Sequence, residues 1–316
     1  MTRVTVGVTC YEARDTIARA VASAAAQTWP DVEILVVDDA STDGSAEVAE
    51  AALRDFPNGR LIRRPVNGGV AAARNTLLAE ATGRYIAFFD DDDESAPDRI
   101  AVQVARIQAE PAADGVPVLC FASGARRYPN GYEIQAPAIG SQGRPPQGDE
   151  VVGYLLVNRR APDAFYGAGT PSCALLAPVA ALRAVGGYDE TLGRAEDVDI
   201  AIRLALAGGR FVGCRERLYL QHATPGSDKT PARNLAAELA VVDKHRAWLE
   251  RQGLYRHAQA WFQFREAWFS RRRGEALRRA LGLALDRPVL TVRRLVQSGP
   301  ARLAHEGRMN RDAGSA

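Results

Sequence analysis

The chain has 316 residues, of which 47% are hydrophobic and 25% are charged, a composition typical of soluble globular proteins. No apolar run approaches the roughly 18 residues that a membrane-spanning helix requires, so we expect no spanning segment. The net charge of +2 is unevenly distributed, because residues 251–316 hold 14 Arg, no Lys and five acidic residues, whereas residues 1–250 carry a net charge of −7. A basic tail on an acidic body indicates contact with an anionic surface.

The first third of the chain alternates short apolar segments with helical patterns. The expected strands are Val4–Thr9, Val32–Val37, Leu61–Arg63 and Tyr85–Phe89, and the expected helices between them are Ala13–Gln27, Ser45–Arg54 and Val70–Glu80. Repeated alternation of this kind predicts a parallel sheet with helices on both faces, so the predicted fold class is α/β.

The pattern is looser after residue 97. The expected elements are a helix around Asp98–Glu110, a strand at Val116–Ala122, a hairpin or long loop over 124–148, a helix near Glu150–Asn158, a strand at Ser172–Ala177, helices at Pro178–Val185 and Glu196–Leu206, and closing strands at Phe211–Gly213 and Arg217–Gln221. From residue 231 onward nearly all of the sequence has a helical pattern. We therefore predict a first domain over residues 1–230 and a basic, mainly helical region over residues 231–316.

Four consecutive aspartates, Asp90–Asp93, follow the apolar strand that begins at Tyr85. Four adjacent carboxylates repel one another, so a fold that holds them together needs a cation. Carboxylate oxygens suit the hard divalent ions Mg²⁺ and Mn²⁺, and the carboxyl end of a strand in an open α/β sheet is where ligands bind. The alternative is a solvated acidic turn before the helix that Pro97 opens.

Two further acidic pairs have similar positions. Asp38-Asp39 follows the second strand, and Glu196-Asp197 begins a helix after a Gly-rich turn. Acidic side chains at a helix N-terminus also offset the helix dipole, so a capping role is the structural alternative for the second pair.

Seven motifs, in this order, resemble those of family 2 glycosyltransferases with the GT-A fold. They are Thr9–Glu12, Gln27–Glu33, Val37–Ser45, Asn67–Asn75, Gly83–Asp93, Gly186–Glu190 and Glu196–Asp199. The resemblance covers roughly residues 3–225 and implies a nucleotide-diphosphosugar transferase domain. It implies a metal-dependent, inverting transfer of a sugar from a nucleotide-diphosphate donor, with a UDP-sugar favoured, to a hydroxyl of a saccharide or lipid-linked acceptor in bacterial cell-surface polysaccharide or glycoconjugate synthesis.

The resemblance also implies roles for single residues in donor binding. Thr9, Tyr11 and Asp39 are expected to hold the nucleotide base, and the carboxylate of Asp39 can accept the imide N–H of uracil. Arg74 is expected near the nucleotide or its diphosphate, where it would pair with negative charge. A structural salt bridge is the alternative for Arg74.

The segment Asp90–Asp92 matches the family's D-x-D motif. Asp90 or Asp91 is expected to hold the ribose hydroxyls, and Asp92 to coordinate the Mn²⁺ or Mg²⁺ that bridges the diphosphate. Because aspartate stands at every position, the register is ambiguous by one residue, and Asp93 is a spare ligand.

Asp197 matches the family's general base, which takes the proton from the acceptor hydroxyl as that oxygen attacks the anomeric carbon. Its neighbour Glu196 is assigned to the acceptor. His222, just after the last predicted strand, is either a further metal ligand or an ordinary polar surface residue. Acceptor recognition is expected within residues 124–171, where Tyr128 and Tyr166 are among the aromatic candidates.

The C-terminal region carries aromatic residues and leucines with flanking arginines. This pattern fits an interfacial amphipathic helix, a packed helical subdomain or a dimer contact; we favour packing for residues 231–285 and weak peripheral membrane contact for the rest. No nucleic-acid-binding motif is present. Four scattered cysteines indicate buried thiols in a reducing compartment, so the expected location is the cytoplasm, peripherally at the inner face of the membrane. The competing functions are a non-catalytic nucleotide- or sugar-binding protein and a sugar-phosphate nucleotidyltransferase.

Overall fold

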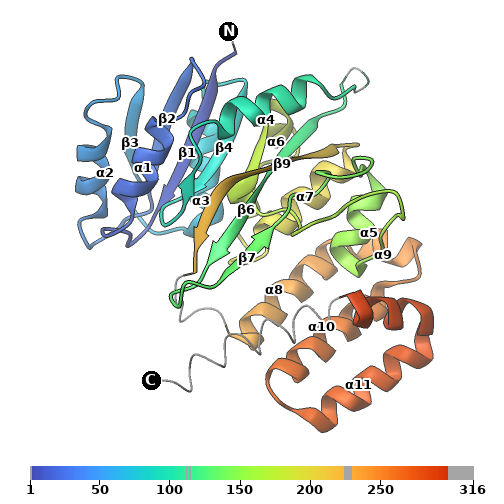
Figure 1. The fold of residues 1–316 in the computed structure, drawn as a ribbon. Coiled ribbons are helices and arrows are strands. Elements are labelled where there is room, and N and C mark those ends of the chain that lie inside the picture. The colour runs from blue at the N-terminus through green and yellow to red at the C-terminus, as the bar shows by residue number, and fades with distance from the viewer. Residues whose placement is uncertain (1, 112, 114, 224–229, 298–316) are drawn as a thin grey trace. The chain divides into compact units, whose positions relative to one another are not determined.

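The computed structural model describes residues 2–111, 113, 115–223 and 230–297 (Figure 1). The chain divides into two compact units, the first formed by Met1–Leu155 and Arg160–Thr224 and the second by Leu156–Arg159 and Pro225–Ala316. We expected one boundary, after residue 230; in the structure the division falls after Thr224, and the short segment Leu156–Arg159 joins the second unit. A search of the described helices finds none that is both long and apolar enough to cross a membrane.

A mixed sheet forms the centre of the first unit. In spatial order the strands are β3 (Gly59–Arg63), β2 (Val32–Asp38), β1 (Val4–Cys10), β4 (Tyr85–Asp90), β8 (Leu175–Pro178), β6 (Val118–Arg127), β9 (Arg210–His222) and β5 (Glu94–Ser95), with β7 (Glu133–Ala136) paired to β6. The first four strands are parallel, β8 is antiparallel to both of its neighbours, and β6 and β9 are parallel. The predicted α/β class is confirmed.

Seven helices accompany this sheet in the described part of the chain. They are α1 (Ile17–Ala25), α2 (Ser45–Leu53), α3 (Gly69–Glu80), α4 (Arg99–Gln108), α5 (Asp149–Val157), α6 (Val179–Ala184) and α7 (Glu196–Leu206). All seven residues of β1 and all seven of β2 are buried, as parallel strands covered on both faces require.

Successive strands are first added on one side of β1 and then on its other side, so the order of the strands reverses at β1. The helices α1 and α2 lead outward to β2 and β3, and α3 crosses back to place β4 on the other side of β1. Parallel crossovers are right-handed, so α1 and α2 lie on one face and α3 on the other. The register pairs Cys10 with Asp38 and Thr9 with Asp90, so the carboxyl ends of β2, β1 and β4 coincide. A reversal of this kind leaves a binding crevice at those ends.

Two expected elements differ from the observed ones. Ser172–Ala174 forms a 3₁₀ turn ahead of β8, where the sequence predicted one continuous strand. The two predicted closing strands form a single strand, β9, whose pairing with β6 shifts register beside Phe121 and Ser123. Gly213 lies within this strand and admits a neighbouring backbone, since an added Cβ would lie 2.4 Å from the carbonyl oxygen of Ile139. The predicted hairpin is present as β6 and β7.

The second unit is helical. It contains α8 (Pro231–Lys244), α9 (Arg246–Arg251), α10 (Tyr255–Phe269), α11 (Arg273–Asp286) and a helical stretch over 288–297. Helix α10 packs against both α8 and α11 and buries Trp261 and Phe264. Thr230 caps α8 by accepting a hydrogen bond from the N–H of Arg233 at 3.3 Å.

Glu33 is a charged residue buried within the parallel part of the sheet. Its carboxylate accepts hydrogen bonds from the hydroxyl of Thr5 and from the N–H groups of Thr82 at 2.6 Å and Gly83 at 3.2 Å. Burial opposes the charged form, but these hydrogen bonds outweigh it and hold the pKa of Glu33 below its ordinary value of 4.5. The carboxylate thereby ties β1 and β2 to the turn that precedes β4.

We expect Glu33→Gln to lower the free energy of unfolding at pH 7 by about 1–3 kcal/mol, because an amide cannot accept all of these hydrogen bonds. Since the folded-state pKa is depressed, the stabilisation is complete above pH 4.5 and is lost as the pH falls through the folded-state pKa. Urea unfolding at several pH values tests this. The control is Glu216→Gln, a change of the same kind at an exposed glutamate. A difference from the wild type that stays constant down to pH 3 would contradict a charged Glu33.

Candidate active site

The acidic segment Asp90–Asp93 begins at the end of β4 and turns toward β5. The carboxylate of Asp91 accepts a hydrogen bond from the backbone N–H of Tyr11 at 2.9 Å, which ties the segment to the loop after β1. The carbonyl oxygen of Asp92 accepts one from the Arg19 guanidinium at 2.6 Å. Burial, together with the neighbouring charges, raises the pKa of Asp91 to about 7 despite the hydrogen bond from Tyr11.

Asp93 is held by a different part of the chain from Asp91. Its Oδ1 accepts a hydrogen bond from the backbone N–H of His222 at 3.1 Å, whereas its buried Oδ2 has no hydrogen-bond partner. Burial, followed by the charges of Asp90 and Asp92, raises the pKa of Asp93. The ring Nε2 of His222 lies 2.7 Å from Oε1 of Glu94, so this ring already has a carboxylate partner.

Arg74, on α3, joins two acidic elements of the site. Its Nη1 donates to Oε1 of Glu196 at 2.7 Å and its Nη2 to Oδ1 of Asp90 at 3.3 Å. The guanidinium also lies 5.4 Å from the ring centroid of Tyr188. The salt bridge that was the alternative for Arg74 is therefore present, and it brings the start of α7 to the end of β4.

Asp197 is the second residue of α7 and is half-buried. Ala195 precedes the helix with a left-handed φ of 62°, and Oδ1 of Asp197 accepts the N–H of Val198 at 2.8 Å. Burial is the main cause that raises the pKa of Asp197; the charge of Glu196 adds to the rise and that of Arg74 opposes it. A carboxylate with a raised pKa is a stronger base toward a hydroxyl than an ordinary aspartate.

Asp39 is buried at the end of β2 and anchors the start of α3. Its backbone N–H donates to the carbonyl of Cys10 at 2.9 Å. Its carboxylate accepts hydrogen bonds from the Arg64 guanidinium, from the N–H of Gly68 at 3.1 Å and from the N–H of Gly69 at 2.7 Å. A carboxylate suits this position because the N-terminus of a helix carries partial positive charge. Sequence reasoning missed Arg64, and its position shortly after β3 was the available signal.

Thr9 and Tyr11 lie beside each other at the end of β1 but differ in exposure. Thr9 is buried and stands in register with Asp90. The side chain of Tyr11 is 51% exposed, so one aromatic ring is open to a ligand at the mouth of the crevice.

Asn75 connects α3 to the Gly186–Glu190 motif, a role that the sequence pattern did not reveal. Its Oδ1 accepts the N–H of Tyr188 at 2.7 Å, and its Nδ2 donates to the Tyr188 carbonyl and to Glu190, both at 2.8 Å. Gly187 has a φ of 68°, and an added Cβ would lie 2.5 Å from Oδ1 of Asn75. The hydroxyl of Tyr188 in turn lies 2.9 Å from that of Ser172.

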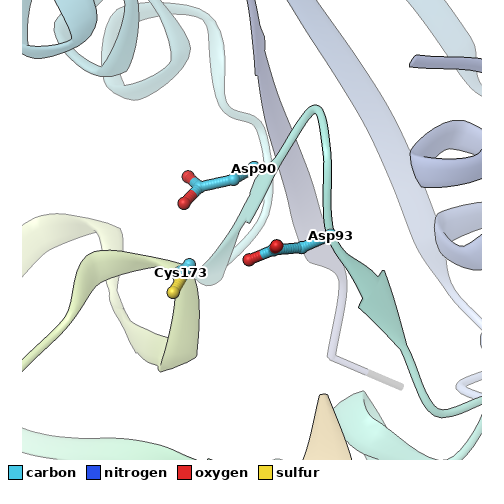
Figure 2. Close-up of side chains that lie close together, drawn as sticks. All are labelled: Asp90, Asp93 and Cys173. Atoms are coloured by element: carbon cyan, nitrogen blue, oxygen red, sulfur yellow. The ribbon is translucent and has the colours of Figure 1, made fainter. Parts of the chain in front are cut away.

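Three side chains in the described part of the chain form a group that could hold a metal ion. The ligand atoms of Asp90, Asp93 and Cys173 all lie within 4.8 Å of one another (Figure 2). The unpartnered Oδ2 of Asp93 fits a cation site, because a buried carboxylate oxygen without a donor is costly. Asp92 and His222 are not members of this group.

The aromatic residues expected near the acceptor have different environments. Tyr128 and Tyr132 stack on each other with ring centroids 5.8 Å apart. Tyr166 is buried with its ring centroid 4.5 Å from that of Tyr154, so it is a packing residue.

Two solved structures show a similar fold. Residues 1–349 of S. aureus TarS in complex with UDP-GlcNAc align with a TM-score of 0.64 and 19% identity over 93% of this chain and 79% of that chain. The mannosyltransferase PcManGT from Pyrobaculum calidifontis, in complex with GDP-Man and Mn²⁺, aligns with a TM-score of 0.56 and 19% identity over 96% of this chain and 82% of that chain. The expected GT-A architecture is thus confirmed.

Curated relatives match over shorter segments. The succinoglycan biosynthesis protein ExoO of Rhizobium meliloti (strain 1021) is 43% identical over 106 residues, which cover 34% of this chain and 30% of that protein. The Escherichia coli enzyme WfaP, named UDP-Glc:alpha-D-GlcNAc-diphosphoundecaprenol beta-1,3-glucosyltransferase, is 36% identical over 112 residues, covering 35% of this chain and 43% of that protein. The chain thus spans less than half the length of these two relatives.

The strongest assignment comes from the sequence model of a whole family. The model described as "Glycosyl transferase family 2" matches residues 5–164, a little more than half of the chain. This range includes Asp39, Arg74 and the Asp90–Asp93 segment, which confirms the resemblance drawn from the motifs. The chain therefore belongs to glycosyl transferase family 2.

Proposed function

We propose that this protein is a metal-dependent, inverting glycosyltransferase that moves a sugar from a nucleotide-diphosphate donor to a hydroxyl of a saccharide or lipid-linked acceptor. The observation that carries the proposal is the Arg74 bridge, which joins the acidic end of β4 to Glu196 and hence to Asp197. One arginine thus brings the acidic segment after β4 and a candidate general base together, next to the strand at which the strand order reverses.

We assign the nucleotide to the crevice at the ends of β1, β2 and β4. The exposed ring of Tyr11 offers a stacking face for the base, and Thr9 and Asp39 lie at the carboxyl ends of β1 and β2. Asp90 and Asp91 would hold the ribose hydroxyls, and Arg74 would face the diphosphate. A UDP-sugar is the favoured donor, because TarS was solved with UDP-GlcNAc and the name of WfaP gives UDP-Glc.

The divalent ion, Mn²⁺ or Mg²⁺, would be held at the Asp90–Asp93 segment, with Asp92 as the ligand that the family motif indicates. PcManGT was solved with Mn²⁺. When bound, such an ion offsets the negative charge that develops on the departing nucleoside diphosphate.

Asp197 is the proposed general base. Its carboxylate would accept the proton of the acceptor hydroxyl while that oxygen attacks the anomeric carbon from the side opposite the leaving group, which inverts the configuration. Burial, which raises the pKa of Asp197, suits the residue to this role. Glu196, held by Arg74, would orient the acceptor.

The second unit offers a surface for an anionic lipid membrane. We expected residues 231–285 to be packed, but Leu277, Leu281 and Leu285 lie on one side of α11 at 63%, 58% and 86% exposure. Three valines of the stretch 288–297 are also exposed. Exposed arginines, Arg278 on α11 and Arg293 on the following stretch, accompany them. Apolar side chains with flanking arginines match a membrane interface with negative charge. This surface would bring the enzyme to a lipid-linked acceptor in bacterial polysaccharide synthesis, at the inner face of the plasma membrane.

The donor assignment predicts thermal stabilisation by one nucleotide. Of UDP, dTDP, GDP and CDP, we expect UDP with Mn²⁺ to raise the melting temperature most, since a ligand that binds only the folded state stabilises it. Asp92→Ala should abolish the dependence on Mn²⁺, whereas Asp55→Ala, a change at an exposed aspartate, should not. A shift with none of the four would favour a non-catalytic protein.

The general-base assignment predicts a loss of turnover without a loss of donor binding. In Asp197→Asn we expect kcat to fall by about 10²–10⁴-fold, because the amide cannot take the proton. Turnover is measured as the release of UDP from UDP-Glc or UDP-GlcNAc in the presence of a diphosphoundecaprenol-linked GlcNAc acceptor. Donor binding is measured as the binding of UDP by calorimetry. Glu216→Gln is the control. Normal turnover in Asp197→Asn would show that another residue is the base.

The membrane assignment predicts binding to acidic vesicles. The wild type should sediment with vesicles of phosphatidylcholine mixed with phosphatidylglycerol, and less with phosphatidylcholine alone, because the arginines add electrostatic attraction. The double variant Leu281→Glu, Leu285→Glu should lose this binding. Leu206→Glu, a change at an exposed leucine of α7, is the control. Equal binding of the double variant and the wild type would exclude this surface.

A further inference from the structure

We infer that Cys173 is a sulfur ligand of the divalent ion, and that the site therefore prefers Co²⁺ and Zn²⁺, and to a smaller degree Mn²⁺, to Mg²⁺, the hardest of these ions. The inference rests on the proposed metal dependence and adds a ligand that the aspartate motif does not contain. It assigns Asp93, Asp90 and Cys173 to one coordination sphere, which leaves the ribose hydroxyls to Asp91.

The first support is that three segments of the chain place metal-binding side chains close together. Asp90 ends β4, Asp93 lies in the turn after it, and Cys173 belongs to the 3₁₀ turn before β8. Their ligand atoms lie within 4.8 Å of one another, so a small movement of the side chains would bring all three to the bond lengths of about 2.0–2.3 Å that one ion requires. Figure 2 shows the two carboxylates and the sulfur close together.

The second support is independent of the clustering. Asp93 is only 7% exposed, and its Oδ2 has no hydrogen-bond partner. A buried carboxylate oxygen without a donor is unfavourable, and a cation on the Asp90 side would satisfy it. Its other oxygen is fixed by the N–H of His222 at 3.1 Å, so the carboxylate is already oriented.

The third support is the environment of the sulfur. Nε2 of Gln221 donates a hydrogen bond to Sγ of Cys173 at 3.2 Å, which fixes the position of the sulfur beside the two carboxylates. Two adjacent residues at the end of β9 thus hold the two ligands: Gln221 contacts Cys173, and His222 contacts Asp93. On binding, the thiol proton would pass to solvent as the metal–sulfur bond forms. Three protein ligands leave positions for Asp92 and the diphosphate oxygens.

Cobalt spectroscopy tests the inference directly. The wild-type protein with UDP is titrated with Co²⁺, and we expect a near-ultraviolet sulfur-to-cobalt charge-transfer band that Zn²⁺ displaces. Cys173→Ser should bind Co²⁺ without this band and should lose about tenfold or more in its preference for Mn²⁺ over Mg²⁺. Cys10→Ser, which changes another buried cysteine near the acidic segment, should keep the band.

The outcomes separate this inference from the proposed function. Binding of Co²⁺ to the wild type without a sulfur band would overturn the role of Cys173 and leave metal-dependent transfer standing. Failure of both Co²⁺ and Mn²⁺ to bind, with UDP bound normally, would overturn metal dependence as well. If Cys173→Ser does not fold, X-ray absorption spectroscopy of the Zn²⁺-loaded wild type replaces it. A sulfur atom at about 2.3 Å from zinc is expected. A zinc ion surrounded by nitrogen and oxygen atoms without sulfur would contradict the inference.

Discussion

The repulsion among the carboxylates at the end of β4 is the constraint on which the site depends. Asp90–Asp93 are adjacent in sequence, and Glu196 and Asp197 lie nearby through Arg74. Leaving a buried carboxylate unpaired costs several kcal/mol, so the fold distributes the charge. Arg74 is shared between Asp90 and Glu196, while Asp91 and Asp93 accept backbone N–H groups from the β1 loop and from β9.

A second buried cation, Arg99, contacts the strand that carries the acidic segment. Arg99, at the start of α4, is buried and donates to the carbonyl of Phe88 at 3.2 Å and to Oε1 of Gln103 at 3.0 Å. Gln103 in turn donates to the carbonyls of Cys120 and Ala174, so one network connects β4, α4, β6 and the turn before β8. The position of Cys173 next to the acidic segment is thus a consequence of packing in the core.

Burial of the acidic side chains makes their charge sensitive to a nearby cation. Burial raises the pKa values of Asp91, Asp93 and Asp197, so each would be charged more readily beside a cation. A divalent ion with its nucleotide would supply that charge, and the loops from β1, β2 and α7 are already in place to contact it.

Local patterns of two to four residues were enough to predict the alternation of strands and helices in the first half and the placement of acidic residues after β2 and β4. The order of the motifs also indicated the family. Three features became visible only in the folded chain: the antiparallel β8 lies between β4 and β6, Asn75 holds Tyr188, and Cys173 lies next to Asp90 and Asp93. These contacts join residues 54 to 113 positions apart, and such pairings depend on the packing of the whole unit, which no local pattern specifies.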